Sequence, residues 1–380
     1  MTAPVGVWGV GTSHFGRFPE RRVETLAWEA IGEAMTAAGV SAGDIDAVFV
    51  GTVFGPPGVG IRVLRGTGIG GVPVLHVEAA CASGTAAFHE AVQAVAAGRY
   101  RTVLAFGVEH LSSLFSSGAI VPEATDADGA AGLPLPGLYA LGAQRYMAVH
   151  GATAAQLAEV AVKNKAHGAL NPRAHLGRKG PPSLDDVLAS KMIAEPLTVL
   201  QCCPTTDGSA AAIIGPARAG DVRVLATSLV SGQPWDQRRD EIWGVAPVRR
   251  AADEAFSAAG VDPGDVDVLE VHDAFTIGEI VTLEALGLCK PGEGAELAIS
   301  GHTALGGRQP VNPSGGLLSR GHPLGATGLA QLAEIVWQLQ GRAGDRQVAG
   351  ARLGLVETLG GAASGMDGNA AVVALLSSSD

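Results

Sequence analysis

One stretch of the chain occurs twice. Residues 33–50 read E-A-M-T-A-A-G-V-S-A-G-D-I-D-A-V-F-V, and residues 254–271 read E-A-F-S-A-A-G-V-D-P-G-D-V-D-V-L-E-V, so the two segments align without a gap. Each segment has the pattern of a helix end, a glycine stop and a buried strand. Such self-similarity indicates an internal duplication. We therefore expect a chain built from two similar halves.

The duplication extends to the elements that follow. Residues 84–98 and residues 325–341 each read as a helix with a small-residue start and a closing glycine, with Cys81 just before the first helix and His322 just before the second. If the halves pack about a pseudo-twofold axis, these two turns converge on one site. We place the first half at residues 1–220 and the second half at residues 221–380.

The order of the elements predicts an α/β fold. In the first half a β-α-β unit indicates parallel strand pairing, with strands expected at residues 5–10, 44–50, 74–77 and 102–107 and helices at residues 23–38 and 83–97. Residues 111–195 have a different character, with several prolines and a local basic cluster. We interpret that region as an insertion in the first half, because long excursions from a compact domain usually carry function or move.

Composition excludes several classes of protein. The formal net charge is −11 and no basic run exceeds two residues, so a nucleic-acid groove or an anionic membrane surface is not expected. The sequence has neither a secretory leader pattern nor eighteen uninterrupted apolar residues. Its four cysteines form neither a metal-ligand spacing nor a disulfide framework. These features favour a cytoplasmic protein with reduced thiols.

The first candidate for chemistry is Cys81, which lies between a short apolar strand and a helix start. Unpaired N–H groups at a helix N-terminus stabilise a thiolate, and small residues follow the cysteine. The alternative is a buried cysteine that acts only as a small hydrophobic side chain. Taken alone, this stretch does not decide between the two interpretations.

Two histidines offer partners for the thiol. His272 follows an apolar strand directly, at the end where sites of α/β sheets collect, although it and Asp273 could instead cap the next helix. His322 comes from a glycine-dense loop over residues 311–328, which could also be a tight turn. A cysteine and two histidines suffice for acyl transfer. A second glycine-rich loop at residues 354–368 could offer N–H groups to an oxyanion.

Together these motifs resemble the thiolase superfamily over nearly the whole chain, and within it the sterol-carrier-protein-type and archaeal-type thiolases. The resemblance rests on V-E-A-A-C-A-S-G, N-K-A-H-G-A-L-N-P, H-D-A-F-T and V-N-P-S-G-G-L-L-S-R-G-H-P-L-G-A-T-G, in this order. It implies a five-layered αβαβα fold from two duplicated halves, with an inserted loop domain that shapes an acyl-CoA pocket. It also implies a homodimer or tetramer and no cofactor or metal, since the CoA thioester itself is the activated substrate.

The resemblance assigns roles to individual residues. Cys81 matches the acylated nucleophile, and His322 matches the base that activates it and then helps bind a thioester oxygen. His272 stands where many thiolases have asparagine in N-E-A-F, so it is expected in the first oxyanion hole. The N–H groups of Cys81 and Gly360 match the second oxyanion hole.

The sequence departs from the family pattern at the second catalytic cysteine. Thr358 occupies the position of the cysteine in the C-x-G motif, and Ala274 that of the cysteine in H-D-C-F. A threonine hydroxyl is a poor substitute acid or base, so we expect His272 to deprotonate the carbon nucleophile.

The resemblance also bears on partners. Archaeal-type relatives often work beside a small zinc-ribbon/OB-fold protein, which is therefore a candidate partner. Basic residues that could bind the CoA phosphates, or could simply be solvated surface charges, are Arg173, Arg178, Lys179, Arg238 and Arg239.

Three functions remain open at this stage. The first is ping-pong transfer of an acyl group from CoA through Cys81 to a carbon nucleophile, or the reverse cleavage. The second is transfer from the same acyl-enzyme to a specialised aromatic or polyketide acceptor. The third is a protein that binds lipid or acyl-CoA without turnover, or cleaves a sterol-like side chain by a retro-aldol reaction, and Cys81 argues against it.

Overall fold

The repeated segments form the same structural unit twice in the computed structural model, which describes residues 3–115, 120, 125–361 and 363–379. Helix α1 (Val23–Ala38) and helix α8 (Val245–Ala259) both end at a glycine in the left-handed region, with φ of 65° at Gly39 and 68° at Gly260. A short 3-10 turn follows in each half, and then strand β2 or β9. The predicted duplication is therefore present in the backbone.

The described strands form one nine-stranded sheet and a separate two-stranded pair. The strand order of the large sheet is β3-β2-β4-β7-β1-β8-β11-β10-β9. Strands β1 and β8 pair antiparallel at the middle, through residues 5–7 and 222–224. Outward from this junction, β1, β7, β4 and β2 of the first half correspond to β8, β11, β10 and β9 of the second. The strands span Val5–Thr12 (β1), Ala47–Gly51 (β2), Val74–Val77 (β3), Val103–His110 (β4), Met192–Ala194 (β5), Leu197–Thr198 (β6), Asp207–Pro216 (β7), Val222–Val230 (β8), Val268–Glu270 (β9), Leu353–Gly360 (β10) and Ala370–Ser377 (β11).

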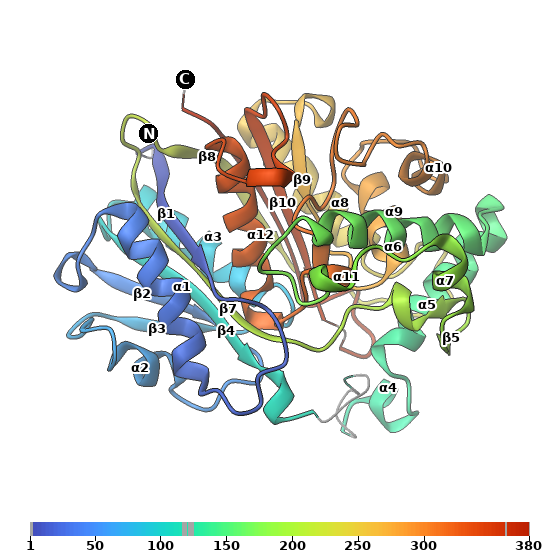
Figure 1. The fold of residues 1–380 in the computed structure, drawn as a ribbon, viewed down its shortest axis with the longest axis horizontal. Coiled ribbons are helices and arrows are strands. Elements are labelled where there is room, and N and C mark those ends of the chain that lie inside the picture. Colours follow the sequence, from blue (N-terminus) through green and yellow to red (C-terminus); the bar gives the residue numbers. More distant parts are fainter. Residues whose placement is uncertain (1–2, 116–119, 121–124, 362, 380) are drawn as a thin grey trace.

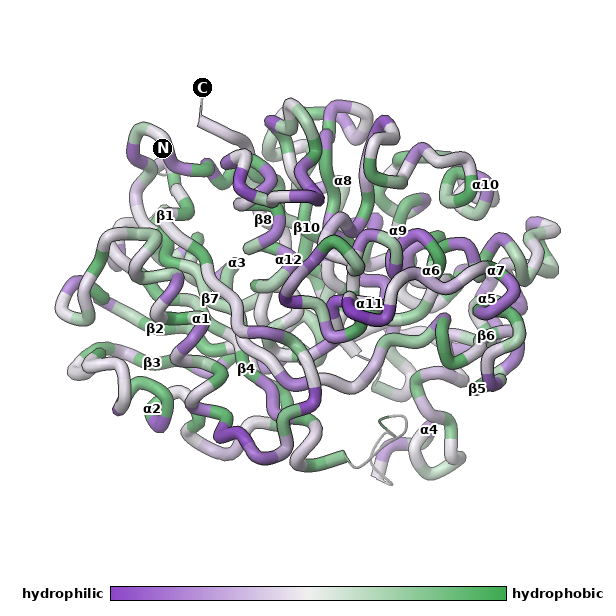
Figure 2. The backbone as a smooth tube through the Cα atoms, in the orientation of Figure 1, coloured by the Kyte–Doolittle hydropathy of each residue, from purple (hydrophilic) through white to green (hydrophobic). Residues whose placement is uncertain are grey.

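Helices α3 (Ser83–Ala96) and α12 (Leu324–Leu339) form the central layer. Both contribute to one hydrophobic core with strands from both halves, while α1 and α8 pack on the outer faces. Figure 2 shows hydrophobic stretches, in green, along the strands of the large sheet. The arrangement is the expected five-layered αβαβα fold. The other helices span Val59–Leu64 (α2), Ala127–Ala130 (α4), Leu135–His150 (α5), Ala154–Ala169 (α6), Leu184–Ala189 (α7), Thr276–Ala285 (α9), Gly294–Ile299 (α10) and Gly316–Ser319 (α11).

The region predicted as an insertion, residues 111–195, contains helices α4 to α7 and strand β5. In Figure 1 this green segment lies on the side of the second half, against α9, α10 and α11. Helix α6 packs on α9, α10 and α11, and α5 packs on α9. A segment that belongs to the first half in sequence therefore covers the second half.

Four sequence expectations need correction. The strand expected at residues 102–107 spans Val103–His110, because it pairs with β7 along that length. The first strand continues to Thr12, because it pairs with β7 along that length. The strand expected from residue 44 begins at Ala47, because residues 42–44 form a 3-10 turn closed by Ser41 and Asp44. Residues 354–360 are not loop but belong to β10. The domain boundary at residue 220 lies between β7 and β8 and stays a prediction.

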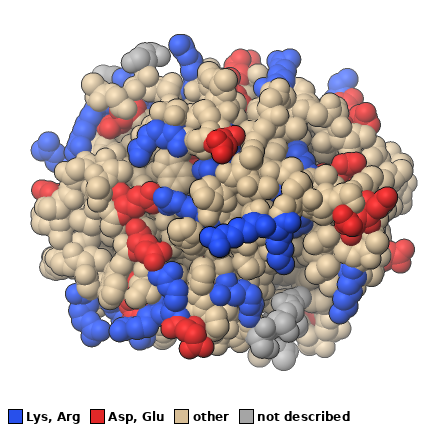
Figure 3. Space-filling model, viewed as in Figure 1, with Lys and Arg blue, Asp and Glu red and all other residues tan. Residues whose placement is uncertain are grey.

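Figure 3 shows how charged side chains are distributed over one face of the molecule. Acidic and basic side chains are interspersed over the face shown in Figure 3. In the part of the chain that the structure describes, no helix has both the length and the apolar character to cross a membrane.

Candidate active site

Cys81 lies on a tight turn between β3 and α3. Ala80, the residue before it, has a φ of 49°, a conformation that non-glycine residues seldom adopt. The Ser83 hydroxyl donates to the Ala80 carbonyl at 2.6 Å and accepts the Ala79 N–H at 2.9 Å. The turn is thus held by hydrogen bonds, and strain of this kind is typical of functional sites.

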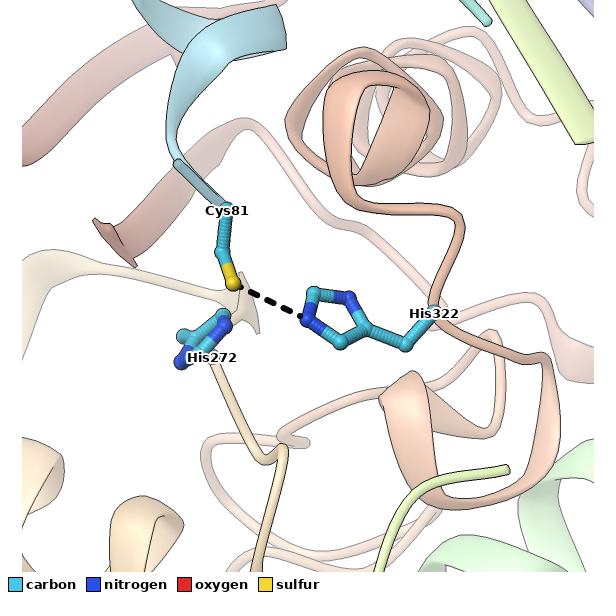
Figure 4. Close-up of side chains that lie close together, drawn as sticks. All are labelled: Cys81, His272 and His322. Carbon is cyan, nitrogen blue, oxygen red and sulfur yellow. Dashed lines mark hydrogen bonds between the residues drawn. The ribbon is translucent and has the colours of Figure 1, made fainter. Parts of the chain in front are cut away.

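His322 meets Cys81 from the second half of the molecule. Its Nε2 atom is 3.2 Å from the Cys81 sulfur, as Figure 4 shows. On the other side of the ring, Nδ1 is 2.8 Å from the Thr327 hydroxyl, which itself donates to the Pro323 carbonyl. Because the hydroxyl proton is already used, Thr327 accepts from Nδ1–H, and the lone pair of the neutral ring is at Nε2. His322 therefore presents an acceptor nitrogen to the thiol.

The two groups form a neutral pair. Burial raises the pKa of the Cys81 thiol to about 12, although N–H groups of Gly361 and of Cys81 itself lower it in part. Burial, His272 and Arg320 hold the pKa of His322 well below its usual 6.5. Loss of solvent therefore outweighs the stabilisation of a thiolate by the N–H groups at the helix start.

His272 completes the cluster. Its backbone N–H donates to the Glu357 carboxylate at 2.9 Å, and neither ring nitrogen has a partner among the described residues. Burial lowers the pKa of its ring to about 3. The alternative of a helix cap fails for Asp273, whose carboxylate accepts instead from Asn164 and the Leu317 N–H. The unpartnered ring is free to bind a substrate.

The Cys81 sulfur and one nitrogen of each histidine lie within 4.8 Å of one another. This spacing suits acyl transfer, in which a thiol, a base and a hydrogen-bond donor act on one carbonyl carbon. A zinc ion would accept the same three ligands, so an assay of this site should include a chelator control.

Glycines allow the two turns to meet. A Cβ atom on Gly84 of α3 would lie 2.6 Å from the Gly325 carbonyl of α12. In turn, a Cβ atom on Gly325 would lie 2.6 Å from the Thr52 Cα. The starts of α3 and α12 therefore touch through their backbones, as the repeat predicted for the turns with Cys81 and His322.

Two residues assigned by resemblance lie differently from expectation. Gly360 is buried at the end of β10, where a Cβ atom would lie 2.1 Å from the Ala79 carbonyl. The next residue, Gly361, lines the cavity instead, and its N–H is directed at the Cys81 sulfur. Thr358 does not line the cavity, because its hydroxyl donates to Gln331 of α12 at 2.8 Å. This geometry does not favour a role for Thr358 as acid or base, and that role stays an untested prediction.

The cluster opens into a cavity of about 520 Å³. Its wall is mostly apolar and aromatic, with Tyr139 of the inserted region stacked against Phe275 at 4.5 Å between ring centroids. Titratable or nucleophilic lining residues that the sequence interpretation did not select are Arg17, Tyr139, Lys165, His175, Cys202 and Cys203. The adjacent cysteines and the N-K-A-H-G-A-L-N-P motif were the available signals for three of them.

Of the five proposed CoA-phosphate residues, only Lys179 lines this cavity. Arg173 is held by the Glu33 carboxylate and the Thr12 carbonyl, so its charge is engaged within the fold. Arg238 pairs with Asp236 on the surface. Like Arg238, Arg178 and Arg239 lie outside the lining, and the structure assigns them no site.

A duplicated αβαβα fold with a cysteine and two histidines where its halves meet defines the thiolase-like class. The chain belongs to the thiolase family, since the profile of the thiolase N-terminal domain matches residues 9–218 and that of the thiolase C-terminal domain-like family matches residues 230–375.

Similarity to individual relatives supports the assignment to the thiolase family. An acetyl-CoA acetyltransferase of Methanothermobacter thermautotrophicus is 40% identical over 372 residues, covering 94% of this chain and 96% of the relative. Sterol carrier protein 2 of Gallus gallus is 36% identical, covering 95% of this chain and 70% of the relative. A solved structure of the Ltp2-ChsH2(DUF35) aldolase matches with a TM-score of 0.84 and 26% identity, covering 99% of this chain and 98% of that chain. The resemblance to sterol-carrier-type and archaeal-type thiolases is thereby confirmed.

Proposed function

We propose that the protein is an acyl-CoA C-acyltransferase that works by a ping-pong mechanism through an acyl-Cys81 intermediate. The observation that carries the proposal is the 3.2 Å contact between the Cys81 sulfur and the lone pair of His322 Nε2. The Methanothermobacter relative, named an acetyl-CoA acetyltransferase, supports the same reaction class.

In the first half-reaction the Cys81 sulfur attacks the thioester carbonyl while its proton passes to His322 Nε2. The carbon–sulfur bond to CoA then breaks, and the departing thiolate takes that proton. N–H groups of Cys81 and Gly361, which are directed at the Cys81 sulfur, would stabilise the oxyanion of the tetrahedral intermediate that forms there. A base and a thiol that are both neutral at rest suit this concerted transfer, because no buried charge has to persist.

In the second half-reaction the acceptor carbon loses its proton to His322, which is neutral again after CoA leaves. That carbon attacks the acyl-Cys81 carbonyl, the bond between the acyl carbon and the Cys81 sulfur breaks, and the sulfur takes the proton from His322. His272 offers an N–H donor to the thioester oxygen of the second substrate. The low pKa of His272 makes it a weak base. An acceptor whose carbon proton is easily lost, such as an electron-rich aromatic or polyketide carbon, would need the least help and is the alternative substrate class.

The test is rapid-mixing kinetics of free CoA release from acetyl-CoA. We expect a burst with an amplitude close to the enzyme concentration, followed by slower turnover when a carbon acceptor is present. The burst should persist after treatment with a chelator. Release without a burst, at any acyl chain length, would contradict the proposal.

The second candidate function is a retro-aldol cleavage, which the likeness to the aldolase structure favours. Cys81 and His322 favour acyl transfer, because an aldol cleavage needs no acylated thiol.

The name of that aldolase pairs Ltp2 with ChsH2, a DUF35 protein. A small zinc-ribbon/OB-fold partner stays a proposal for this chain, and full activity of the purified chain alone would count against it.

A further inference from the structure

Two buried lysines lie two residues apart on α6. Lys163 is 9% exposed, and its ammonium group forms an ion pair with the Glu279 carboxylate at 2.5 Å. It also donates to the Val311 carbonyl at 3.3 Å. The fold itself thus supplies an anion for Lys163, as expected for a charge taken out of water.

Lys165 is even less exposed, at 5%, but has a different environment. Its ammonium group donates to the Leu318 carbonyl at 2.7 Å, and the residue lines the active-site cavity. Within the described ranges it forms no ion pair. The acidic residue whose charge it feels, Asp273, already accepts hydrogen bonds from Asn164 and the Leu317 N–H.

Lys165 belongs to the same part of the cavity as the nucleophile. Cys81, Cys203 and Lys165 all line the cavity. The charge of Cys203 acts on the pKa of Lys165, and that of Cys81 acts on the pKa of Cys203. Lys179 and Arg17 also line it, but both are exposed, and they are therefore better placed for the phosphates of CoA at the entrance. Lys165 is instead buried in the wall of the cavity, at 5% exposure.

A buried ammonium group without an ion pair, in the wall of a mostly apolar cavity, is costly unless a ligand brings the anion. We propose that Lys165 binds a carboxylate of the acyl group, so that the enzyme prefers CoA thioesters of dicarboxylic acids. This proposal rests on the acyl-transfer function and names its substrate class. Burial lowers the pKa of Lys165 only to about 8, which leaves the amine largely protonated at neutral pH.

The step is an ordinary acyl transfer. With succinyl-CoA, the bond between the acyl carbon and the CoA sulfur breaks, a thioester to the Cys81 sulfur forms, and the CoA thiolate takes the proton that His322 received. The distal carboxylate stays ionised and hydrogen-bonds to the Lys165 ammonium group, a charge-assisted contact.

The experiment compares two four-carbon donors, succinyl-CoA and butyryl-CoA, which differ in the terminal carboxylate. Single-turnover acylation of Cys81 is followed at pH 7 by intact mass. We expect the wild type to acylate faster from succinyl-CoA by about 10- to 100-fold, the range for a hydrogen bond between charged groups. In Lys165→Met the preference should disappear, and in Lys165→Arg it should be retained in part.

Lys163→Met is the matched control, because it removes a buried lysine of the same helix whose anion is Glu279. This variant should lower the stability of the protein. In the folded fraction, the ratio of the acylation rate with succinyl-CoA to that with butyryl-CoA should stay unchanged. Equal acylation by the two donors in the wild type would overturn the proposal. So would an equal loss with both donors in Lys165→Met, which would place CoA itself on the lysine. Absence of acylation by every donor would instead refute the acyl-transfer function.

Discussion

At the scale of single residues, the orientation of His322 depends on Thr327. The Thr327 hydroxyl accepts from Nδ1 of His322 and donates to the Pro323 carbonyl, so it fixes the proton on the side of the ring away from Cys81. Thr327→Val should slow acylation of Cys81 by about 10- to 100-fold, by analogy with the partners that orient metal-bound histidines. The measurement is the burst rate of CoA release.

Thr85→Val provides a matched control for that change. Thr85 is also a buried helix threonine, and its hydroxyl donates to the Ala82 carbonyl without touching His322. A burst rate that falls equally in both variants would show that the loss is structural rather than a consequence of the ring's protonation.

Glu357 makes stability depend on pH. Burial raises the pKa of its carboxyl from 4.5 to about 8. A raised pKa in the folded state means that the stabilising contribution is complete below pH 4.5 and is lost as the pH rises through 8. The glutamine of Glu357→Gln cannot ionise and keeps an oxygen for the His272 N–H. As the pH rises from 5 to 8, the wild type should therefore lose about 1 kcal/mol or more in its free energy of unfolding relative to this variant.

Urea unfolding at several pH values checks this expectation, with the exposed Glu20→Gln as the control. If the difference in the free energy of unfolding between Glu357→Gln and wild type were constant over this pH range, Glu357 would not be the group that titrates.

At the scale of elements, the site depends on the contact between α3 and α12. A methyl group on Gly84 would lie 2.6 Å from the Gly325 carbonyl, and that atom is backbone and cannot rotate away. Gly84→Ala should therefore destabilise the protein by about 1–3 kcal/mol and separate Cys81 from His322, with loss of the burst. Thermal unfolding and CoA release measure the two effects.

Gly32→Ala in α1 is the control, because a Cβ atom there would meet nothing within 4 Å. It should stabilise the helix by about 0.5–1 kcal/mol. Normal stability and an intact burst in Gly84→Ala would contradict the close approach of the two helices.

The elements were largely predictable because local patterns determine them. The observed bounds of α1 and β3 are those expected from the sequence. The observed end of the helix after Cys81 differs from the expected end by one residue. Residues 354–360 were expected as loop because their glycines suggested a turn, whereas pairing with β11 makes them a strand. Tertiary pairing of this kind is not visible in a local pattern.

At the scale of the whole molecule, the repeat predicted that Cys81 and His322 would meet, since duplicated halves bring equivalent turns together. It did not predict the cavity wall. Lys165 and Tyr139 belong to the inserted region, which has no counterpart in the repeat and folds over the opposite half. Their position depends on long-range packing, so neither spacing nor propensity could reveal it.

The homodimer expected from the resemblance can be tested at the edge of the sheet. Strand β3 is an edge strand, and its Leu75 is 44% exposed. An exposed apolar edge favours pairing with a second copy. Leu75→Lys should weaken the dimer at least about tenfold, because lysine on an edge strand opposes such pairing. Sedimentation at several concentrations measures this, with Val149→Lys on α5 as the control.

The central claim is that Cys81 carries the acyl group, and intact mass spectrometry after incubation with acetyl-CoA tests it most directly. We predict that the wild type gains a single acetyl group, removable by free CoA, and that Cys81→Ala gains none. An acetyl adduct of the same stoichiometry in Cys81→Ala would contradict the account.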